Sequence, residues 1–149
     1  MATITSSPPS PMPRFLIVDD LSGMRRIIRG MLQEMGFTEA DEAKDGETAF
    51  KKLKTGKFDF VISDTELPDM DGSQLVSKVR HAHDRRVKDT PVLLVGSDAS
   101  ARDVVLAAQQ GADGFVVKPF TKATLEEKLE LIKQRFHCWP CQPRKQAGV

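Results

Sequence analysis

The sequence predicts an α/β fold, a doubly wound parallel sheet of five strands that five helices cover on both faces. Between Arg14 and His137, short apolar runs alternate with amphipathic stretches of helical period, which is typical of a parallel sheet. The apolar runs are continuous rather than alternating with polar residues, as in strands that are buried on both faces. The chain has 149 residues, of which 40% are hydrophobic, and this size suits a single domain with one core.

The first half of this pattern contains two strands and two helices. A buried strand is expected at Phe15–Val18, directly before two aspartates. Apolar residues at helical spacing from Met24 to Met35 predict the first helix. A weaker strand near Glu39–Ala43 is rich in acidic residues, which favours the edge of the sheet. A second helix follows it and ends near Gly56.

The second half contains three strands and three helices. Its strands are expected at three apolar runs: Phe58–Ser63, Pro91–Val95 and Gly114–Val117. Its helices are expected where apolar residues recur at helical spacing: around Leu75–Val79, at Ala99–Gln110, and from Thr121 or Thr124 to Phe136. Each strand is thus followed by a helix, as right-handed crossovers between parallel strands require.

The two ends of the chain differ from the middle in composition. Residues 1–13 are rich in Pro and Ser and carry no charge, which predicts a disordered arm ahead of a domain at 14–137. Residues 138–149 form a short tail whose charged residues are Arg144 and Lys145. The formal net charge of +1 therefore leaves the 14–137 segment at −1, with 20 basic and 21 acidic residues. Such a balance excludes a globally basic nucleic-acid binder.

Hydropathy and cysteine content predict a cytoplasmic protein. No apolar run approaches the roughly 20 residues that cross a membrane, and the N-terminus lacks the features of a signal peptide. Both cysteines, Cys138 and Cys141, lie in the tail, so no disulfide framework holds the domain together. Their Cys-x-x-Cys spacing does not favour a redox or zinc role, because it follows a helix and has no second pair. The sequence therefore favours neither nucleic acid nor membrane as a partner.

Polar side chains follow four of the predicted strands at the point where each strand ends. Asp19-Asp20 follows the first, Asp64 the third, Gly96-Ser97 the fourth and Lys118 the fifth. In a parallel sheet these positions meet at one edge. Three carboxylates close together suit Mg²⁺, which relieves their repulsion, and Lys118 can hold a phosphate. A single Asp after a strand is usually a turn or cap residue, but matching positions on three strands are hard to explain in that way.

Four segments resemble the receiver domain of two-component response regulators: Phe15–Asp20, Phe60–Asp64, Leu67–Gly72 and Val117–Phe120. The resemblance covers residues 14–136 and is nearest to the single-domain chemotaxis regulators of the CheY type, through Asp19–Arg26 and Lys118–Lys128. It implies a flavodoxin-like fold with the strand order 2-1-3-4-5. It also implies a monomer that a sensor histidine kinase phosphorylates.

The resemblance further implies a role for each strand-end residue. Asp64 would accept the phosphoryl group from a phosphohistidine of the kinase. Asp20 and Asp64 would bind Mg²⁺ directly, Asp19 would bind it through water, and the backbone carbonyl of residue 66 would be a further ligand. Lys118 would pair with phosphoryl oxygens, and its peptide bond to the proline that follows would be cis. Phosphoryl transfer needs positioning and charge neutralisation, which these groups supply.

Two positions depart from the family pattern. Family members usually carry Thr or Ser at the end of the fourth strand, where the hydroxyl binds the phosphoryl group, and this chain has Gly96 followed by Ser97. Glycine offers only its backbone N–H there, so either Ser97 or backbone amides replace the hydroxyl, or the switch is altered. Glu66 adds an acidic side chain two residues after Asp64. It either weakens phosphoryl binding, reaches toward the metal, or is a solvated loop residue.

The resemblance places a phosphorylation-dependent binding surface on the fourth helix, the fifth strand and the fifth helix. Its candidate residues are Phe115, Val104, Ala108 and Lys128. Phe115 takes the position of an aromatic residue whose rotamer often reports activation, although core packing accounts for it equally well. Phosphorylation at Asp64 adds charge and would bias this surface between two states.

Three functions are compatible with these residues. The leading hypothesis is a receiver that is no enzyme beyond its own phosphorylation and dephosphorylation, and that acts by contacting a flagellar motor switch or another chemotaxis protein. The alternative, motivated by Gly96 and Glu66, is a phosphate sink or a phosphorylation-independent adaptor. A hydrolase of the haloacid-dehalogenase kind is disfavoured, because it expects Asp-x-Asp after the first strand, where this chain has Asp19-Asp20-Leu21.

Overall fold

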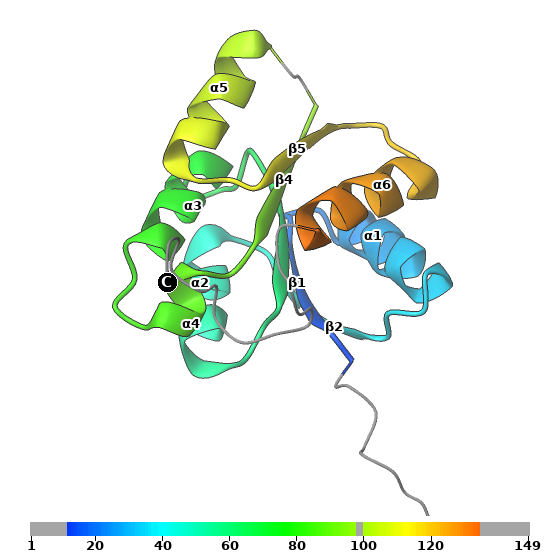
Figure 1. Cartoon of the computed structure of the whole chain (residues 1–149), viewed down its shortest axis with the longest axis horizontal. Coiled ribbons are helices and arrows are strands. Elements are labelled where there is room, and N and C mark those ends of the chain that lie inside the picture. Colours follow the sequence, from blue (N-terminus) through cyan, green and yellow to red (C-terminus); the bar gives the residue numbers. More distant parts are fainter. Residues whose placement is uncertain (1–11, 98–99, 135–149) are drawn as a thin grey trace, which may run out of the picture.

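The computed structural model describes residues 12–97 and 100–134, in which five strands form one sheet (Figure 1). The strands lie in the order β2-β1-β3-β4-β5, and all neighbouring pairs are parallel. Their bounds are β1 Arg14–Val18, β2 Glu39–Ala43, β3 Phe60–Asp64, β4 Val92–Gly96 and β5 Gly114–Val117. The predicted parallel sheet and its strand order are therefore confirmed.

Helices cover both faces of the sheet, and six are present in the described part of the chain (Figure 1). Two lie on one face: α1 (Ser22–Glu34) and α6 (Lys122–Lys133). Four lie on the other: α2 (Gly46–Thr55), α3 (Gly72–Arg80), α4 (Arg85–Lys88) and α5 (Ala101–Gln110). Thr121 caps α6, because its hydroxyl accepts a hydrogen bond from the backbone N–H of Thr124 at 3.2 Å.

The prediction of five helices was wrong by one, since the structure has the additional helix α4. This helix is a single turn of four residues, too short to show a helical period in the sequence. The Asp84 carboxylate caps it by accepting a hydrogen bond from the N–H of Arg86 at 2.9 Å. Val87 buries its side chain to 2% exposure against the core. One cap and one buried residue are therefore what fix this turn.

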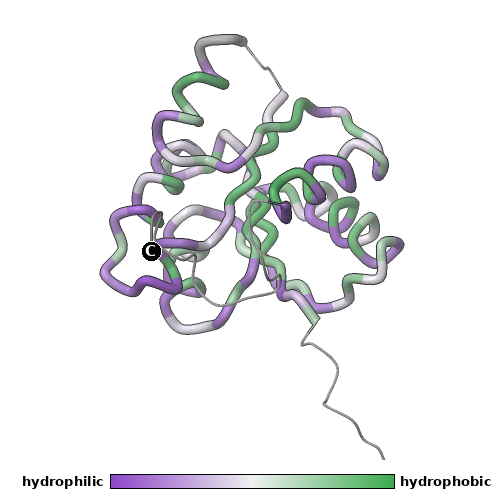
Figure 2. The backbone as a smooth tube through the Cα atoms, in the orientation of Figure 1, coloured by the Kyte–Doolittle hydropathy of each residue, from purple (hydrophilic) through white to green (hydrophobic). Residues whose placement is uncertain are grey.

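Successive residues of each inner strand are buried on opposite faces of the sheet. In β1, Phe15 and Ile17 pack in the cluster beneath α1 and α6, whereas Leu16 and Val18 pack beneath the other helices. All four are at most 1% exposed. Hydrophobic residues accordingly run through the strands at the centre of the molecule (Figure 2). Burial on both faces explains why the apolar runs are continuous in the sequence.

Strand β2 lies at the edge of the sheet, as its acidic composition predicts. Its side chains are only partly buried up to Ala43, which is 3% exposed. The Glu42 carboxylate accepts hydrogen bonds from Arg25 at 2.7 Å and from Arg29 at 2.9 Å, both on α1. These ion pairs fasten the edge strand to the neighbouring helix.

Some sequence predictions concern residues outside those that the structure describes. They are the arm before residue 12, the 138–149 tail with Cys138 and Cys141, and the extension of the last helix to Phe136. Within the described residues, none of the helices combines the length and the apolar character needed to span a bilayer.

Candidate functional site

The carboxyl ends of β1, β3 and β5 bring together four charged side chains, as the sequence predicts. The ammonium of Lys118, after β5, lies 3.3 Å from an oxygen of Asp19 and 3.2 Å from an oxygen of Asp64. Asp20 completes the cluster, because one carboxylate oxygen each from Asp19, Asp20 and Asp64 lie within 4.8 Å of one another. Residues far apart in the chain therefore form one acidic site with a single lysine.

Backbone hydrogen bonds hold Asp19 in place at the end of β1. Its N–H donates to the carbonyl of Ala43 at 3.1 Å, which extends the pairing with β2 by one residue. Its carboxylate accepts a hydrogen bond from the N–H of Leu21 at 2.9 Å, and its carbonyl accepts one from the Arg25 guanidinium at 2.5 Å. Asp19 is only 1% exposed, whereas Asp20 faces solvent. The neighbouring aspartates thus have different environments, one fixed and one accessible.

Burial and mutual repulsion shift the protonation equilibria of the site. Burial raises the pKa of the Asp19 carboxyl above its ordinary value of 3.8; the N–H of Leu21 opposes the shift, and the charge of Asp64 adds to it. Burial alone would lower the pKa of the Lys118 ammonium, but the carboxylates of Asp64 and Asp19 outweigh it and raise the pKa. One ammonium ion therefore faces three carboxylates. This surplus of hard, negatively charged oxygens fits a Mg²⁺ ion.

Asp64 lies at the end of β3 with its carboxylate partly accessible, at 11% exposure. One oxygen contacts Lys118, and the other accepts a hydrogen bond from the N–H of Glu66 at 3.2 Å. The Glu66 side chain is exposed beside the site. All three interpretations of the Glu66 side chain stay predictions. The role of its carbonyl as a ligand stays a prediction.

Gly96, the last residue of β4, lies against two side chains. A Cβ atom added to Gly96 would lie 2.9 Å from the hydroxyl oxygen of Thr65 and 3.0 Å from the ring of Phe115. Its carbonyl accepts a hydrogen bond from the N–H of Lys118 at 2.7 Å, which ties β4 to the end of β5. Ser97, one residue further, is exposed. The peptide bond from Lys118 to the proline that follows is cis, as predicted.

Thr65 is the residue that sequence reasoning missed at this site. It lies in a pocket of about 290 Å³ next to Asp64, together with Ser97 and Phe115, and Leu106 of α5 lines the other side. The only signal in the sequence is that Thr65 directly follows Asp64. That position alone does not reveal its approach to Gly96, which depends on the pairing of β3 with β4.

The predicted switch residues lie on three elements. Phe115 of β5 is partly buried against the core, and Val104 and Ala108 are exposed on α5. Lys128 is partly exposed on α6, which covers the other face of the sheet (Figure 1). The exposed apolar residues of this region also include three that the prediction omitted: Val105, Leu106 and Val117, at 53, 43 and 43% exposure. An apolar surface therefore lies next to the pocket that contains Thr65.

Comparison with known proteins settles the family. The model of the response regulator receiver domain matches residues 15–130. The chain belongs to this family. The receiver is 46% identical over 123 residues to chemotaxis protein CheY-3 of Vibrio cholerae, covering 83% of this chain and 93% of that one. It is 48% identical over 124 residues to chemotaxis protein CheY of Pseudomonas aeruginosa, covering 83 and 98% of the two chains.

Solved structures of other receivers have the same fold. Chemotaxis response regulator CheY4 of Vibrio cholerae matches with a TM-score of 0.74 and 34% identity, covering 82% of this receiver and 99% of that chain. Response regulator TrrA of Thermotoga maritima, in complex with Mg²⁺ and BeF, matches with a TM-score of 0.70 and 35% identity, covering 81 and 99%. The flavodoxin-like expectation and the identification as a CheY-like response regulator receiver are therefore confirmed.

Proposed function

We propose that Asp64 is the phosphoryl acceptor of this receiver. The observation that carries the proposal is the convergence of Lys118 with the carboxylates of Asp64 and Asp19 within 3.3 Å. An oxygen of Asp64 attacks the phosphorus of a phosphohistidine, the P–N bond breaks, and the histidine nitrogen keeps the electron pair. The product is an acyl phosphate on Asp64. Lys118 then pairs with a phosphoryl oxygen.

The three carboxylates Asp19, Asp20 and Asp64 are the residues that would hold Mg²⁺. Their close approach supports this role, as does the presence of Mg²⁺ and BeF in the complex of the TrrA receiver. The bound ion supplies neutralisation of the charge that gathers on the transferred phosphoryl oxygens. The residues themselves orient the acceptor, because Leu21 fixes Asp19 and Glu66 fixes Asp64 through their N–H groups.

We propose a chemotaxis role, in which a sensor histidine kinase supplies the phosphoryl group and a flagellar motor switch protein is the target. The two chemotaxis relatives support this role, since the receiver covers more than nine-tenths of each. The exposed apolar residues of α5 and β5, among them Val105 and Val117, offer a surface for such a partner. The cytoplasmic location and the monomeric state stay predictions.

Substitution Asp64→Asn tests the acceptor. Acetyl phosphate and Mg²⁺ should label the wild-type receiver with an acid-labile phosphoryl group, and the variant should not be labelled, because an amide oxygen cannot form the acyl phosphate. Mass spectrometry of the intact protein measures the label. Asp103→Asn, which removes an exposed carboxylate of α5 outside the cluster of Asp19, Asp20 and Asp64, is the matched control and should be labelled normally. Labelling of the Asp64→Asn variant would exclude the proposal.

A second candidate function is a phosphorylation-independent adaptor. Gly96 favours it, because glycine has no hydroxyl to bind the phosphoryl group. Binding of the target with and without beryllofluoride distinguishes the two functions. A switch binds its target more tightly with beryllofluoride, whereas an adaptor binds equally in both conditions.

A further inference from the structure

The side chain of Thr65 fills the space that a side chain at position 96 would occupy. The N–H of Thr65 donates to the carbonyl of Val95 at 3.0 Å, which fixes the residue beside the end of β4. A Cβ atom on Gly96 would lie 2.9 Å from the Thr65 hydroxyl oxygen and 3.1 Å from its methyl carbon. Contacts this short are not tolerated without movement. A larger residue at 96 therefore requires the Thr65 side chain to move.

The Thr65 side chain lines the same pocket as Phe115 and Leu106. It belongs to the residue after Asp64, and it shares the space above Gly96 with the ring of Phe115. The pocket that it lines continues to Leu106, which is 43% exposed on α5. Among the described residues, no side chain forms a hydrogen bond with the Thr65 hydroxyl, so it is free to take a new partner.

We propose that Thr65 is the positioning residue of the phosphorylated receiver, supplying from β3 the hydroxyl that β4 lacks. The inference rests on Asp64 being the acceptor. The hydroxyl donates a hydrogen bond to an oxygen of the phosphoryl group on Asp64. When Thr65 moves toward that oxygen, the space above Gly96 opens, and the ring of Phe115 moves into it. The ring and the Leu106 side chain then rearrange together, which couples the acyl phosphate to the apolar surface of α5.

Two substitutions of Thr65 separate its hydroxyl from its shape. Thr65→Val keeps the volume and removes the hydroxyl, whereas Thr65→Ser keeps the hydroxyl. The readout is the change in methyl NMR shifts of Val104 and Leu106 when beryllofluoride and Mg²⁺ are added. We expect these shift changes in the wild type and in Thr65→Ser. In Thr65→Val the population of the α5 state that beryllofluoride induces should fall at least about tenfold, because one hydrogen bond to a charged group is lost. A purely structural role would not be rescued by serine.

The outcomes distinguish this inference from the proposed function. If the wild type neither binds beryllofluoride nor is labelled by acetyl phosphate, the proposal that Asp64 is the phosphoryl acceptor is wrong. If the wild type responds and Thr65→Val responds equally, only the role of Thr65 is overturned. Ser97→Ala tests the rival assignment, since Ser97 directly follows Gly96 and also lines the pocket. Loss of the response in Ser97→Ala with a normal Thr65→Val would assign the role to Ser97 instead.

Exchanging the two positions gives an independent test. Gly96→Thr alone should lose most of the α5 response, because its Cβ meets Thr65 at 2.9 Å. Combining it with Thr65→Ala removes that contact and places the hydroxyl on β4, so the double variant should regain the response. A double variant that is no better than Gly96→Thr would contradict the idea that the two positions share one space.

Discussion

At the scale of single residues, the site depends on close approaches between backbones that leave no room for a side chain. Gly72, the first residue of α3, donates its N–H to the carbonyl of Thr65 at 2.7 Å. A Cβ atom on Gly72 would lie 2.6 Å from the carbonyl oxygen of Asp64 and 2.9 Å from the Cα of Thr65. The neighbouring atoms belong to the backbone, so they cannot turn aside as the end of a long side chain can. Gly72 therefore sets how closely α3 approaches the acceptor.

Substitution Gly72→Ala is expected to lower the free energy of unfolding by about 1–3 kcal/mol, the usual range for overpacking. Because the displaced backbone carries Asp64, labelling by acetyl phosphate should also slow. Urea unfolding and the labelling rate measure the two effects. Gly30→Ala is the control: it stands inside α1, and within the described residues no atom outside the adjoining helix backbone lies within 4 Å of its added Cβ. It should stabilise the protein by about 0.5–1 kcal/mol and leave labelling unchanged. A Gly72→Ala variant as stable as the wild type would refute the close approach.

The sequence predicts some residues of the site but not others. Asp19, Asp20, Asp64 and Lys118 could be predicted, because each directly follows or ends a strand and parallel strands end at one edge. The meeting of Thr65 with Gly96 could not be predicted. It depends on the register in which Asp64 lies opposite Val95 in the neighbouring strand, and no residue pattern specifies that register.

At the scale of elements, ion pairs join the sheet edge to helix α1 in addition to apolar packing. Hydrogen bonds from Arg25, and secondly from Arg29, hold the pKa of the Glu42 carboxyl below its ordinary value of 4.5. A carboxyl group with a lowered pKa in the folded state stabilises the fold above its unfolded pKa. That stabilisation disappears as the pH falls through the folded pKa. The ion pairs between β2 and α1 should therefore weaken in acid.

Glu42→Gln is expected to cost about 1 kcal/mol of stability near neutral pH, since Glu42 is partly exposed and salt screens the pair. Well below pH 4.5 the difference from the wild type should vanish, because the wild-type carboxyl is then protonated as well. Urea unfolding over a series of pH values measures this. Glu39→Gln, an exposed position on the same strand, is the control and should differ little from the wild type at any pH. A pH-independent cost of Glu42→Gln would mean that packing, and not charge, joins the two elements.

The elements differ in how well the sequence predicts them, and the reason is length. Helices of nine residues or more repeat their apolar positions often enough to reveal the helical period, as α1 and α3 do. Helix α4 has four residues and one buried side chain, Val87, so its sequence is that of a charged loop. Strand β3 begins at Phe60 and not at Phe58, and just before it the Asp59 carboxylate accepts a hydrogen bond from the N–H of Arg14 at 2.8 Å. A hydrogen bond between residues so far apart in the chain leaves no periodic signal in the sequence.

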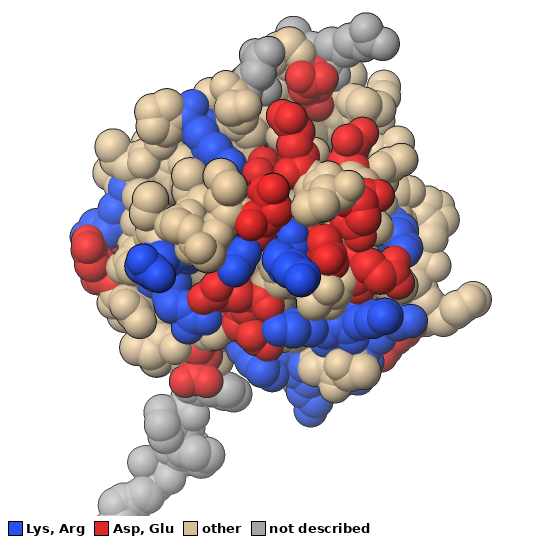
Figure 3. All heavy atoms as spheres, turned by 180° about the vertical axis from the view of Figure 1, so that it is seen from behind, with Lys and Arg blue, Asp and Glu red and all other residues tan. Residues whose placement is uncertain are grey.

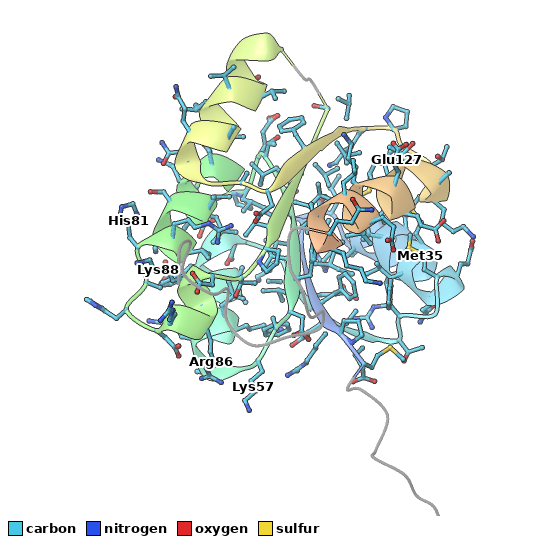
Figure 4. The ribbon with its side chains drawn as sticks, in the orientation of Figure 1. Met35, Lys57, His81, Arg86, Lys88 and Glu127 are labelled. Atoms are coloured by element: carbon cyan, nitrogen blue, oxygen red, sulfur yellow. The ribbon has the colours of Figure 1, made fainter. Side chains whose placement is uncertain are left out.

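At the scale of the whole molecule, a net charge near zero conceals a separation of charges. Acidic side chains gather in the upper part of the face shown in Figure 3, and a belt of Lys and Arg lies below them. Basic residues also project into solvent on the α3–α4 side of the molecule, where Figure 4 shows His81, Arg86 and Lys88 pointing outward. Within the site, by contrast, Lys118 is the one cation among the described residues that contacts the carboxylates of Asp19 and Asp64.

Mg²⁺ should therefore stabilise the whole fold. An ion that binds the native state and not the unfolded chain raises the free energy of unfolding by about 2.7 kcal/mol at 100 times its dissociation constant. Asp20→Asn should remove most of this gain, since it deletes one of the three carboxylates. Because Asp20 is exposed, the substitution should leave the fold intact. Thermal unfolding at increasing Mg²⁺ and constant ionic strength measures the effect, and Asp103→Asn should keep the full gain. An equal gain in the wild type and in Asp20→Asn would place the ion elsewhere on the molecule.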